Sequence, residues 1–408
     1  MEFLERGRAA LAFPDFRRYQ VGRLCAIVGI QMQMVAVGWQ VYALTGRAFD
    51  LGLVGLVQFV PFTLLVTAGG HAADRYDRRR VLMAGYFIQG LCSLALAALA
   101  IGNVQRVWPI YLVLAVLGAG RAFASPAASA LTPHLVPVEH FSNAIAWGSS
   151  ARQIAMLVGP ALGGLLYTAT NASPVYLLAG LASFLGAWLV LRMEVRLGRM
   201  EPKDLSWSTV LAGFAYVWEK RLLLGTFSLD LFAVLLGGAT ALLPVYAKDI
   251  LHVGPWGLGM LRSAPAVGAG LAALWLAHRP LQRNAGKVML GFVFLFGLAT
   301  VIFGVSRSLP LSLVALAVLG GSDMVSVVIR LTLEQLGTPP QMRGRVSAVN
   351  MMFIGASNEL GEFESGATAA LWGPVPAVVL GGVGTCLVVG LWALLFPELR
   401  EVDSVQSP

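Results

Sequence analysis

Charged residues are scarce in this chain of 408 amino acids. Asp, Glu, Lys and Arg together make up 12% of the sequence, while hydrophobic residues make up 57%. Soluble globular domains carry about a quarter charged residues. The composition therefore excludes an ordinary soluble domain and predicts a protein that crosses a membrane many times.

The sequence also lacks the short motifs of several enzyme and pump classes. Its three cysteines show no CxxC spacing, its five histidines lie in loops or at the ends of apolar segments, and neither HExxH nor GxSxG occurs. There is no GxxxxGK[ST] phosphate loop either. The first residues, MEFLERGRAALAFPDFRRYQ, are charged and amphipathic, unlike a cleavable signal peptide. We therefore expect no enzyme activity, no metal site, no cofactor and no nucleotide-driven transport.

Long apolar segments recur throughout the chain, and a transmembrane helix needs about 20 such residues. Twelve spans are predicted, with boundaries good to a few residues. They cover residues 20–44, 51–71, 80–101, 107–130, 142–168, 174–192, 222–247, 256–278, 287–306, 309–333, 345–371 and 375–396. The expected fold class is all-α, a polytopic membrane protein of twelve transmembrane helices.

Basic residues are distributed unevenly between the loops. Most of the 29 Lys and Arg lie in segments at one membrane face. The loops at the opposite face hold only Arg47, Arg106, Lys248 and Arg307. The positive-inside rule then places both termini in the cytoplasm, as expected for a multi-pass protein of the cell inner membrane. Because topology explains the net charge of +8, no nucleic-acid partner is expected.

Landmarks recur at an offset of 204 residues, half the chain. QVYAL at 40–44 matches PVYAK at 244–248, and Pro61 matches Pro265. Two homologous six-helix halves with the same membrane orientation are therefore predicted. The expected domains are an N-terminal bundle (1–192), a cytoplasmic linker (193–221) and a C-terminal bundle (222–408). The linker piece SWSTVLAGFAYVWEKR fits either an amphipathic helix on the membrane surface or a solvated linker.

The charged residues inside the spans are absent from every third predicted helix. Spans 3, 6, 9 and 12 have no charged residue in their apolar stretches. The intramembrane charges are Arg121, Arg152, Asp230, Arg262, Asp323, Arg330, Glu359, Glu362 and Glu364. A charge at mid-bilayer costs about 2.5–3.5 kcal/mol, so these side chains must face protein or water. Every third helix is therefore predicted to be peripheral, and the others surround a polar interior.

The charged loop between spans 2 and 3 resembles the signature loop of the major facilitator superfamily, and the resemblance extends over the whole chain. The matching residues are Gly70, Asp74, Arg75, Arg78 and Arg79. Asp77 stands where the family usually has glycine, and His278 replaces the second-half counterpart of Asp74. The resemblance implies that Asp74 lies against the start of span 11 and stabilises the outward-facing state. A carboxylate is favourable there because the amino terminus of a helix carries partial positive charge. For the arginines, topology alone is the alternative explanation.

A second resemblance lies in span 5. Its matching residues are Gly159, Pro160, Gly163 and Gly164, which resemble a signature of superfamily exporters. Ordinary close packing of small residues is the alternative. The strings RAFASPAASALTPHLV, LDLFAVLLGGATALLPVYAKDIL and RGRVSAVNMMFIGASNELGEFESG resemble the branch that contains the enterobactin exporter. That branch implies export of a small organic solute, whether siderophore-like, drug-like or amphiphilic.

Four buried carboxylates are candidates for proton coupling: Asp230, Asp323, Glu359 and Glu362. Asp230 lies nine residues beyond Arg221, about 14 Å at a helical rise and near mid-bilayer. The two glutamates are three residues apart and share one helix face, where their repulsion favours protonation of one. The alternative is a structural ion pair with Arg152, Arg262 or Arg330.

Six residues are candidates for a substrate cavity: Arg152, Arg262, Arg121, Gln31, Gln33 and Trp39. By the family resemblance, spans 5 and 8 adjoin across the two halves, so Arg152 and Arg262 would favour an anionic or catecholate solute. Buried ion pairs, and packing in the case of Trp39, are the alternatives.

These features together predict a secondary active transporter. It would export a small organic solute across the inner membrane by proton antiport with alternating access. Its partners would be the solute, protons and the lipid bilayer, and it would act as a monomer. The competing hypotheses are a lipid or lysolipid flippase of the same fold and a nontransporting membrane scaffold or receptor.

Overall fold

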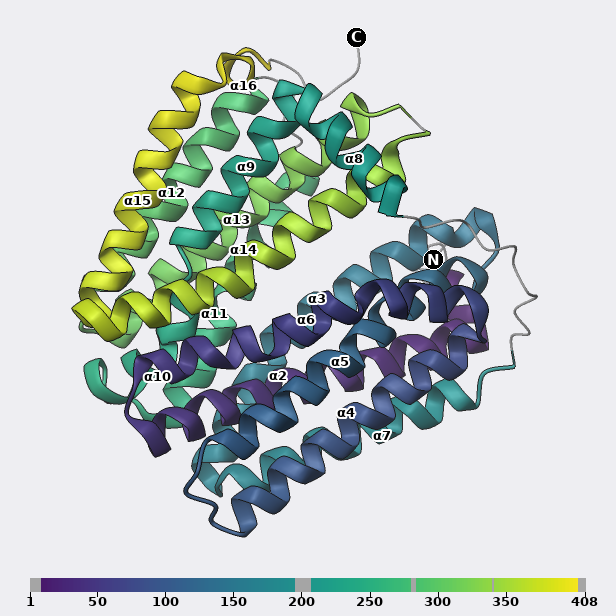
Figure 1. Ribbon diagram of the computed structural model, residues 1–408, viewed down its shortest axis with the longest axis vertical. Coiled ribbons are helices and arrows are strands. Elements are labelled where there is room, and N and C mark those ends of the chain that lie inside the picture. Colours follow the sequence, from purple (N-terminus) through teal and green to yellow (C-terminus); the bar gives the residue numbers. More distant parts are fainter. Residues whose placement is uncertain (1–8, 195–206, 280–283, 340, 403–408) are drawn as a thin grey trace. The chain divides into compact units, whose positions relative to one another are not determined.

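The computed structural model describes residues 9–194, 207–279, 284–339 and 341–402, which form helices and no strand (Figure 1). The long helices are α2 (Pro14–Thr45), α3 (Ala48–Arg75), α4 (Arg78–Ile101), α5 (Trp108–Leu131), α6 (Phe141–Ala169), α7 (Ala172–Leu191), α9 (Arg221–Leu236), α11 (Gly254–His278), α12 (Ala285–Val305), α13 (Leu309–Gly337), α14 (Arg343–Trp372) and α15 (Pro374–Leu395). The short ones are η1 (Ala9–Ala12), η2 (Thr132–His134), η3 (Val138–His140), α8 (Trp207–Glu219), η4 (Ala239–Leu242), α10 (Leu243–Val245), η5 (Tyr246–Ile250) and α16 (Pro397–Glu401).

The predicted all-α membrane fold is confirmed. Each predicted span coincides with a helix or, for the seventh, with a broken series of helices. Ten helical stretches in the described part of the chain are long and apolar enough to cross a membrane. Helices α6 and α14, with 29 and 30 residues, are as long as these stretches but are not among the ten. The repeated prolines occupy matching places, since Pro61 lies inside α3 and Pro265 inside α11.

The seventh span is broken because glycines and a proline interrupt it. Helix α9 ends at Leu236, and η4, α10 and η5 continue the chain to Ile250. A Cβ atom on Gly238 would lie 2.5 Å from the carbonyl oxygen of Gly361 in α14. The break therefore lets this segment approach the α14 backbone more closely than a residue with a side chain allows.

The helices form two compact units. Unit 1 holds the described residues within Met1–Gly46, Val57–Lys203 and Gly254–Ser263, and unit 2 those within Arg47–Leu56, Asp204–Val253 and Ala264–Pro408. Each unit thus contains most of one predicted half and a short helix end from the other. Part of the predicted linker, residues 195–206, lies outside the described part of the chain.

The helices predicted to be peripheral carry large apolar side chains on their surfaces. Helix α4 packs against α5 and α7, while α12 packs against α13 and α15 (Figure 1). Phe87, Leu181, Phe294 and Leu387 are exposed, one on each of α4, α7, α12 and α15. In a bilayer such side chains contact lipid at no desolvation cost.

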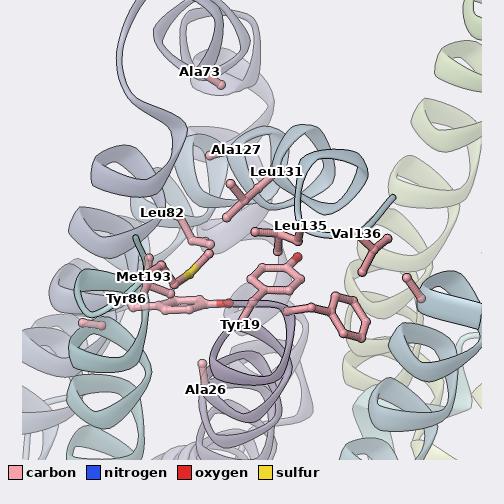
Figure 2. Packing of buried hydrophobic residues seen from close by; sticks show 14 of the residues in the cluster. Tyr19, Ala26, Ala73, Leu82, Tyr86, Ala127, Leu131, Leu135, Val136 and Met193 are labelled. Atoms are coloured by element: carbon pink, nitrogen blue, oxygen red, sulfur yellow. The ribbon is translucent and has the colours of Figure 1, made fainter. Parts of the chain in front are cut away.

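An apolar cluster fills one end of unit 1 (Figure 2). Tyr19 of α2 and Leu131 of α5 are almost fully buried in it, and the Tyr19 hydroxyl donates to the carbonyl oxygen of Ala128 at 3.0 Å. Tyr86 of α4 and Met193, which follows α7, join the same cluster. This cluster marks the end of unit 1 that the charge pattern places at the cytoplasmic face.

Part of the predicted linker is helical and docks on unit 2. Helix α8 packs against α14, and Phe214 and Phe353 bring their rings to 6.0 Å. The Tyr216 hydroxyl donates to the carbonyl oxygen of Gly337 at 3.2 Å. Leu211 and Trp218 lie on the face of α8 that is turned away from α14 and are 63% and 74% exposed. The helix therefore has the two-faced pattern of an amphipathic helix; its contact with the membrane surface stays a prediction.

Candidate functional site

Unit 2 contains a buried ion pair. Asp230 of α9 and Arg330 of α13 are in direct contact, and their side chains are only 8% and 2% exposed. Arg330 was one of the cations predicted as an alternative partner for a buried carboxylate. Because each charge compensates the other, removal of either partner leaves an unbalanced charge inside the bundle.

A second carboxylate lies beside this pair. Asp230 and Asp323 line one small cavity of about 10 Å³, close to the smallest volume that holds a water molecule, about 10–15 Å³. The remaining lining residues are Ala233, Val234, Val293, Phe296, Ser322 and Ser326. The structure therefore brings together two of the predicted proton-coupling residues and adds serine hydroxyls to them.

The buried polar residues continue along α13 to a residue that the sequence analysis missed. Glu334 is 4% exposed and accepts a hydrogen bond of 2.6 Å from the side-chain amide of Asn350 on α14. It lies one helical turn beyond Arg330, whose positive charge acts on it. The predicted span ended at residue 333, so Glu334 was assigned to a loop. The spacing of four residues from a buried arginine was the signal available in the sequence.

Glu359 and Glu362 converge on one point of α3. The Oε2 atoms of these two glutamates lie 3.2 and 2.8 Å from where a Cβ atom would stand on Gly55. The predicted shared face of the pair is thus seen directly, and glycine at position 55 makes room for both carboxylates. Glu364 is turned elsewhere and accepts a hydrogen bond of 2.7 Å from Thr368.

The arginines of unit 1 lie in different surroundings. Arg152 of α6 is exposed, and Arg121 of α5 is half-buried with its guanidinium 5.8 Å from the centre of the Phe62 ring. Arg23 of α2, half-buried, was not singled out from the sequence. Electrostatic repulsion from Arg23 and Arg121 acts on Arg152, so the three side chains influence one another.

Arg262 belongs to unit 1 although it lies in the second half of the chain. Helix α11 begins inside this unit, and the Ser263 hydroxyl next to Arg262 donates to the carbonyl oxygen of Leu157 in α6 at 2.7 Å. The start of α11 is therefore fixed against the helix that carries Arg152. A shared role of Arg152 and Arg262 in binding stays a prediction.

The other cavity candidates have mixed positions. Gln33 is fully buried and accepts a hydrogen bond of 2.5 Å from the Ser93 hydroxyl, so it faces the peripheral helix α4 inside the bundle. Gln31 is half-buried and faces α6, where its Cβ lies 2.6 Å from the ideal Cβ position of Gly159. Trp39 packs edge-on against Tyr167 with ring centres 6.4 Å apart. Trp39 thus shows the packing named as its alternative, while a role of either residue in substrate binding stays a prediction.

The charged loop between α3 and α4 is held by local contacts. Asp77 is the N-cap of α4, since its carboxylate accepts a hydrogen bond of 2.9 Å from the Arg79 backbone N–H. This explains an aspartate where the family usually has glycine. Asp74 lies 3.7 Å from Arg78, which also donates to the carbonyl oxygen of Ala130 at 3.1 Å.

The remaining residues of this loop differ in their contacts. Arg79 donates to the backbone carbonyl of Met193, while Arg75 is exposed. Among the described residues beyond its own helical turn, no atom lies within 4 Å of a Cβ built on Gly70. The predicted contact of Asp74 with span 11 concerns a residue in each unit and stays a prediction.

The glycines around Pro160 are points of close helix contact. A Cβ on Gly163 would lie 2.8 Å from the Cα of Met32 in α2, and one on Gly164 would lie 2.5 Å from the carbonyl oxygen of Pro255 in α11. The packing role named as an alternative is therefore present. The link of this motif to export stays a prediction.

Comparison with known proteins agrees with this architecture. The sequence pattern of the Major Facilitator Superfamily matches residues 21–362. The chain is 27% identical to the enterobactin exporter EntS of Citrobacter koseri over 393 residues, which cover 95% of this chain and 93% of that protein. EntS of Shigella boydii serotype 18 has the same identity and coverage.

Solved structures share the fold at low identity. The nucleoside transporter NupG superposes with a TM-score of 0.69 at 15% identity, covering 94% of this chain and 98% of that one. A bacterial homologue of the iron transporter ferroportin, in an inward-facing state, superposes with a TM-score of 0.69 at 16% identity, covering 95% and 98%. These similarities concern the fold alone.

Proposed function

Because the chain belongs to the major facilitator superfamily, we propose that it is a secondary active transporter that exports a small organic solute in exchange for protons. The solute leaves the cytoplasm across the inner membrane by alternating access. The charge asymmetry of the loops supports a topology with both termini in the cytoplasm. The protein acts as a monomer, with each substrate pathway inside one chain.

The observation that carries the proposal is the grouping of carboxylates inside unit 2. Asp230 and Asp323 line one cavity, and Glu359 and Glu362 meet at Gly55. A proton-coupled transporter needs groups that gain and lose a proton within the membrane, and adjacent carboxylates favour this because their negative charges repel each other. A role in coupling also explains why several carboxylates occupy helices that cross a bilayer.

The direction and the solute class rest on similarity. The relatives named as enterobactin exporters support export rather than uptake. A siderophore-like, drug-like or amphiphilic solute fits this branch, and the arginines of unit 1 favour one that carries negative charge.

The test is efflux of a panel of labelled solutes from cells that overproduce the protein, with and without a proton uncoupler. We expect at least one solute to leave faster than from control cells, and the uncoupler to abolish the difference. The Glu359→Gln/Glu362→Gln variant should lose this uphill efflux, whereas Glu139→Gln, at an exposed residue of η3, should keep it. Efflux that persists unchanged with the uncoupler and in the glutamate variant would contradict proton antiport.

A further inference from the structure

Three arginines of unit 1 lie at one depth. Arg23 is nine residues after the start of α2, Arg121 ten residues before the end of α5, and Arg152 eleven residues after the start of α6. At a helical rise of 1.5 Å, each is about 14–17 Å from the same end of the unit. That end is marked by the apolar cluster, which contains residues from all three helix ends (Figure 2).

Gly148 of α6 lies next to Arg23 and one helical turn before Arg152. The Nη1 atom of Arg23 lies 3.2 Å from where a Cβ atom would stand on Gly148. Arg152 follows Gly148 by one helical turn and therefore shares its face of α6. The positive charges of Arg23 and Arg121 act on Arg152 electrostatically. The three arginines, on three helices, are thus near enough for their charges to act on one another.

This cluster of arginines has no acidic partner in the part of the chain that the structure describes. In the described ranges of the chain, no ion pair joins Arg23, Arg121 or Arg152 to an aspartate or glutamate. Grouped cations within a membrane are costly unless negative charge balances them. The balancing charge is therefore expected from a bound molecule.

An unsatisfied amide lies at the same place. Gln20 is 6% exposed, and both its Nε2 and its Oε1 atoms have no hydrogen-bond partner among the described residues. Its Nε2 lies 3.7 Å from the ideal Cβ position of Gly148, beside Arg23. Because buried polar side chains are nearly always bonded, an amide without an acceptor in the described part of the chain is available to a bound molecule.

We propose that Arg23, Arg121, Arg152 and Gln20 bind the acidic group of an exported aromatic acid. Guanidinium groups hold carboxylate, phosphate and sulfonate through paired, charge-assisted hydrogen bonds, and the Phe62 ring beside Arg121 supplies an apolar surface for the aromatic part. The site rests on the proposed export function and gives its substrate class. Its depth lets a solute from the predicted cytoplasmic side reach it before crossing the membrane.

The test is binding of defined probes to the purified full-length protein in detergent, by calorimetric titration. The probes are phthalate, phenyl phosphate and benzenesulfonate, with the neutral phthalamide as control. We expect saturable binding of at least one anion, with Kd raised tenfold or more in Arg23→Gln and in Arg152→Gln. Arg106→Gln, which removes the same charge from an exposed outer-loop position, should bind like the wild type.

Gln20→Leu separates binding from a structural role. It removes two buried unbonded polar atoms, so the melting temperature should stay the same or rise, while the Kd of the anion increases. A lowered melting temperature with unchanged Kd would overturn the assignment of Gln20. Absence of saturable binding of all three anions to the wild type, or equal Kd values in wild type, Arg23→Gln and Arg152→Gln, would overturn the site.

The binding measurement does not depend on transport. Anion binding that needs the arginines, in a protein that exports no solute in response to protons, would support this site and contradict the proposed function. Proton-driven export that is unaffected by Arg23→Gln and Arg152→Gln would support the function and contradict the site.

Discussion

In unit 2, the buried carboxylate of Asp230 faces Arg330, and Glu334 is bonded to Asn350. In unit 1, Arg23 lies beside Gly148 of α6, one helical turn before Arg152, and the charges of Arg23 and Arg121 act on Arg152. The first arrangement balances its charges within the protein. In our proposal, the positive charge of the second is balanced by a bound ligand.

Under the proposed function, the two units have separate tasks. The carboxylates of unit 2 would exchange protons, while an arginine compensates the charge of one of them. Unit 1 holds cations whose mutual repulsion a bound anion would relieve. Export coupled to protons needs both tasks, and the following predictions test whether they are separate.

The largest expected effect is on stability, after loss of one partner of the buried ion pair. Arg330→Met should lower the free energy of unfolding by roughly 3–5 kcal/mol, because Asp230 is left as an uncompensated buried charge. Thermal unfolding of the purified protein in detergent checks this. The double variant Asp230→Leu/Arg330→Met should recover most of the loss.

The matched control lies in unit 1. Arg152→Met removes a charge that is repelled by its neighbours, so its melting temperature should equal or exceed that of the wild type. Equal destabilisation by Arg330→Met and Arg152→Met would show that both arginines have a compensating partner inside the protein. The proposed difference between the two units would then be wrong.

A smaller loss of stability is expected at glycines where two helix backbones are in close contact. Both units contain such glycines. A Cβ on Gly164 would lie 2.5 Å from a backbone oxygen of α11 in unit 1, and one on Gly366 would lie 2.7 Å from the Cα of Gly52 in unit 2. Gly164→Ala and Gly366→Ala should each cost about 1–3 kcal/mol in the free energy of unfolding, because backbones must separate.

Gly270→Ala is the control, since no atom of the described residues outside its own helical turn lies within 4 Å of its ideal Cβ position. Its melting temperature should not fall. If Gly164→Ala and Gly366→Ala also left the melting temperature unchanged, close backbone contact would not be what fixes these helix pairs.

The sequence was sufficient to predict the spans, because a membrane helix is defined by the length of an apolar segment and this property is local. That the helices without charged residues face lipid stays a prediction. The N-cap role of Asp77 is also local, because it depends on the backbone two residues further on.

Partners across helices were not predictable in the same way. Pairing of Asp230 with Arg330 and convergence of two glutamates on Gly55 depend on how each helix is rotated, which is decided by tertiary packing. Gln33 shows the same limit, because a glutamine in a span predicts a polar interior and not the hydrogen bond to Ser93 that it makes. Arg23 was missed because it lies close to the end of its span.

The smallest expected effect concerns the charged loop. Asp74 has a counterpart, His278, in the second half, so the comparison extends to the inner loops. If Asp74 caps span 11, its contribution is about 0.3–1 kcal/mol, and Asp74→Asn should shift the ratio of inward- to outward-facing protein by up to about fivefold toward inward. Distances between spin labels on the inner loops measure this ratio.

His278→Ala should shift the ratio much less than Asp74→Asn does. The Nδ1 atom of His278 lies within hydrogen-bond distance, 2.8 Å, of the carbonyl oxygen of Leu274 in its own helix. Identical distance distributions for wild type and Asp74→Asn would leave membrane topology as the demonstrated role of the loop.

The central claim is that solute binding and proton coupling are carried by different units, and transport in proteoliposomes tests it most directly. For a solute identified by the efflux panel, exchange of internal for external solute is compared with uphill transport driven by a pH gradient. The Glu359→Gln/Glu362→Gln variant should keep exchange and lose uphill transport, whereas Arg152→Gln should lose both. Loss of exchange in the glutamate variant, or full uphill transport in either variant, would contradict the account.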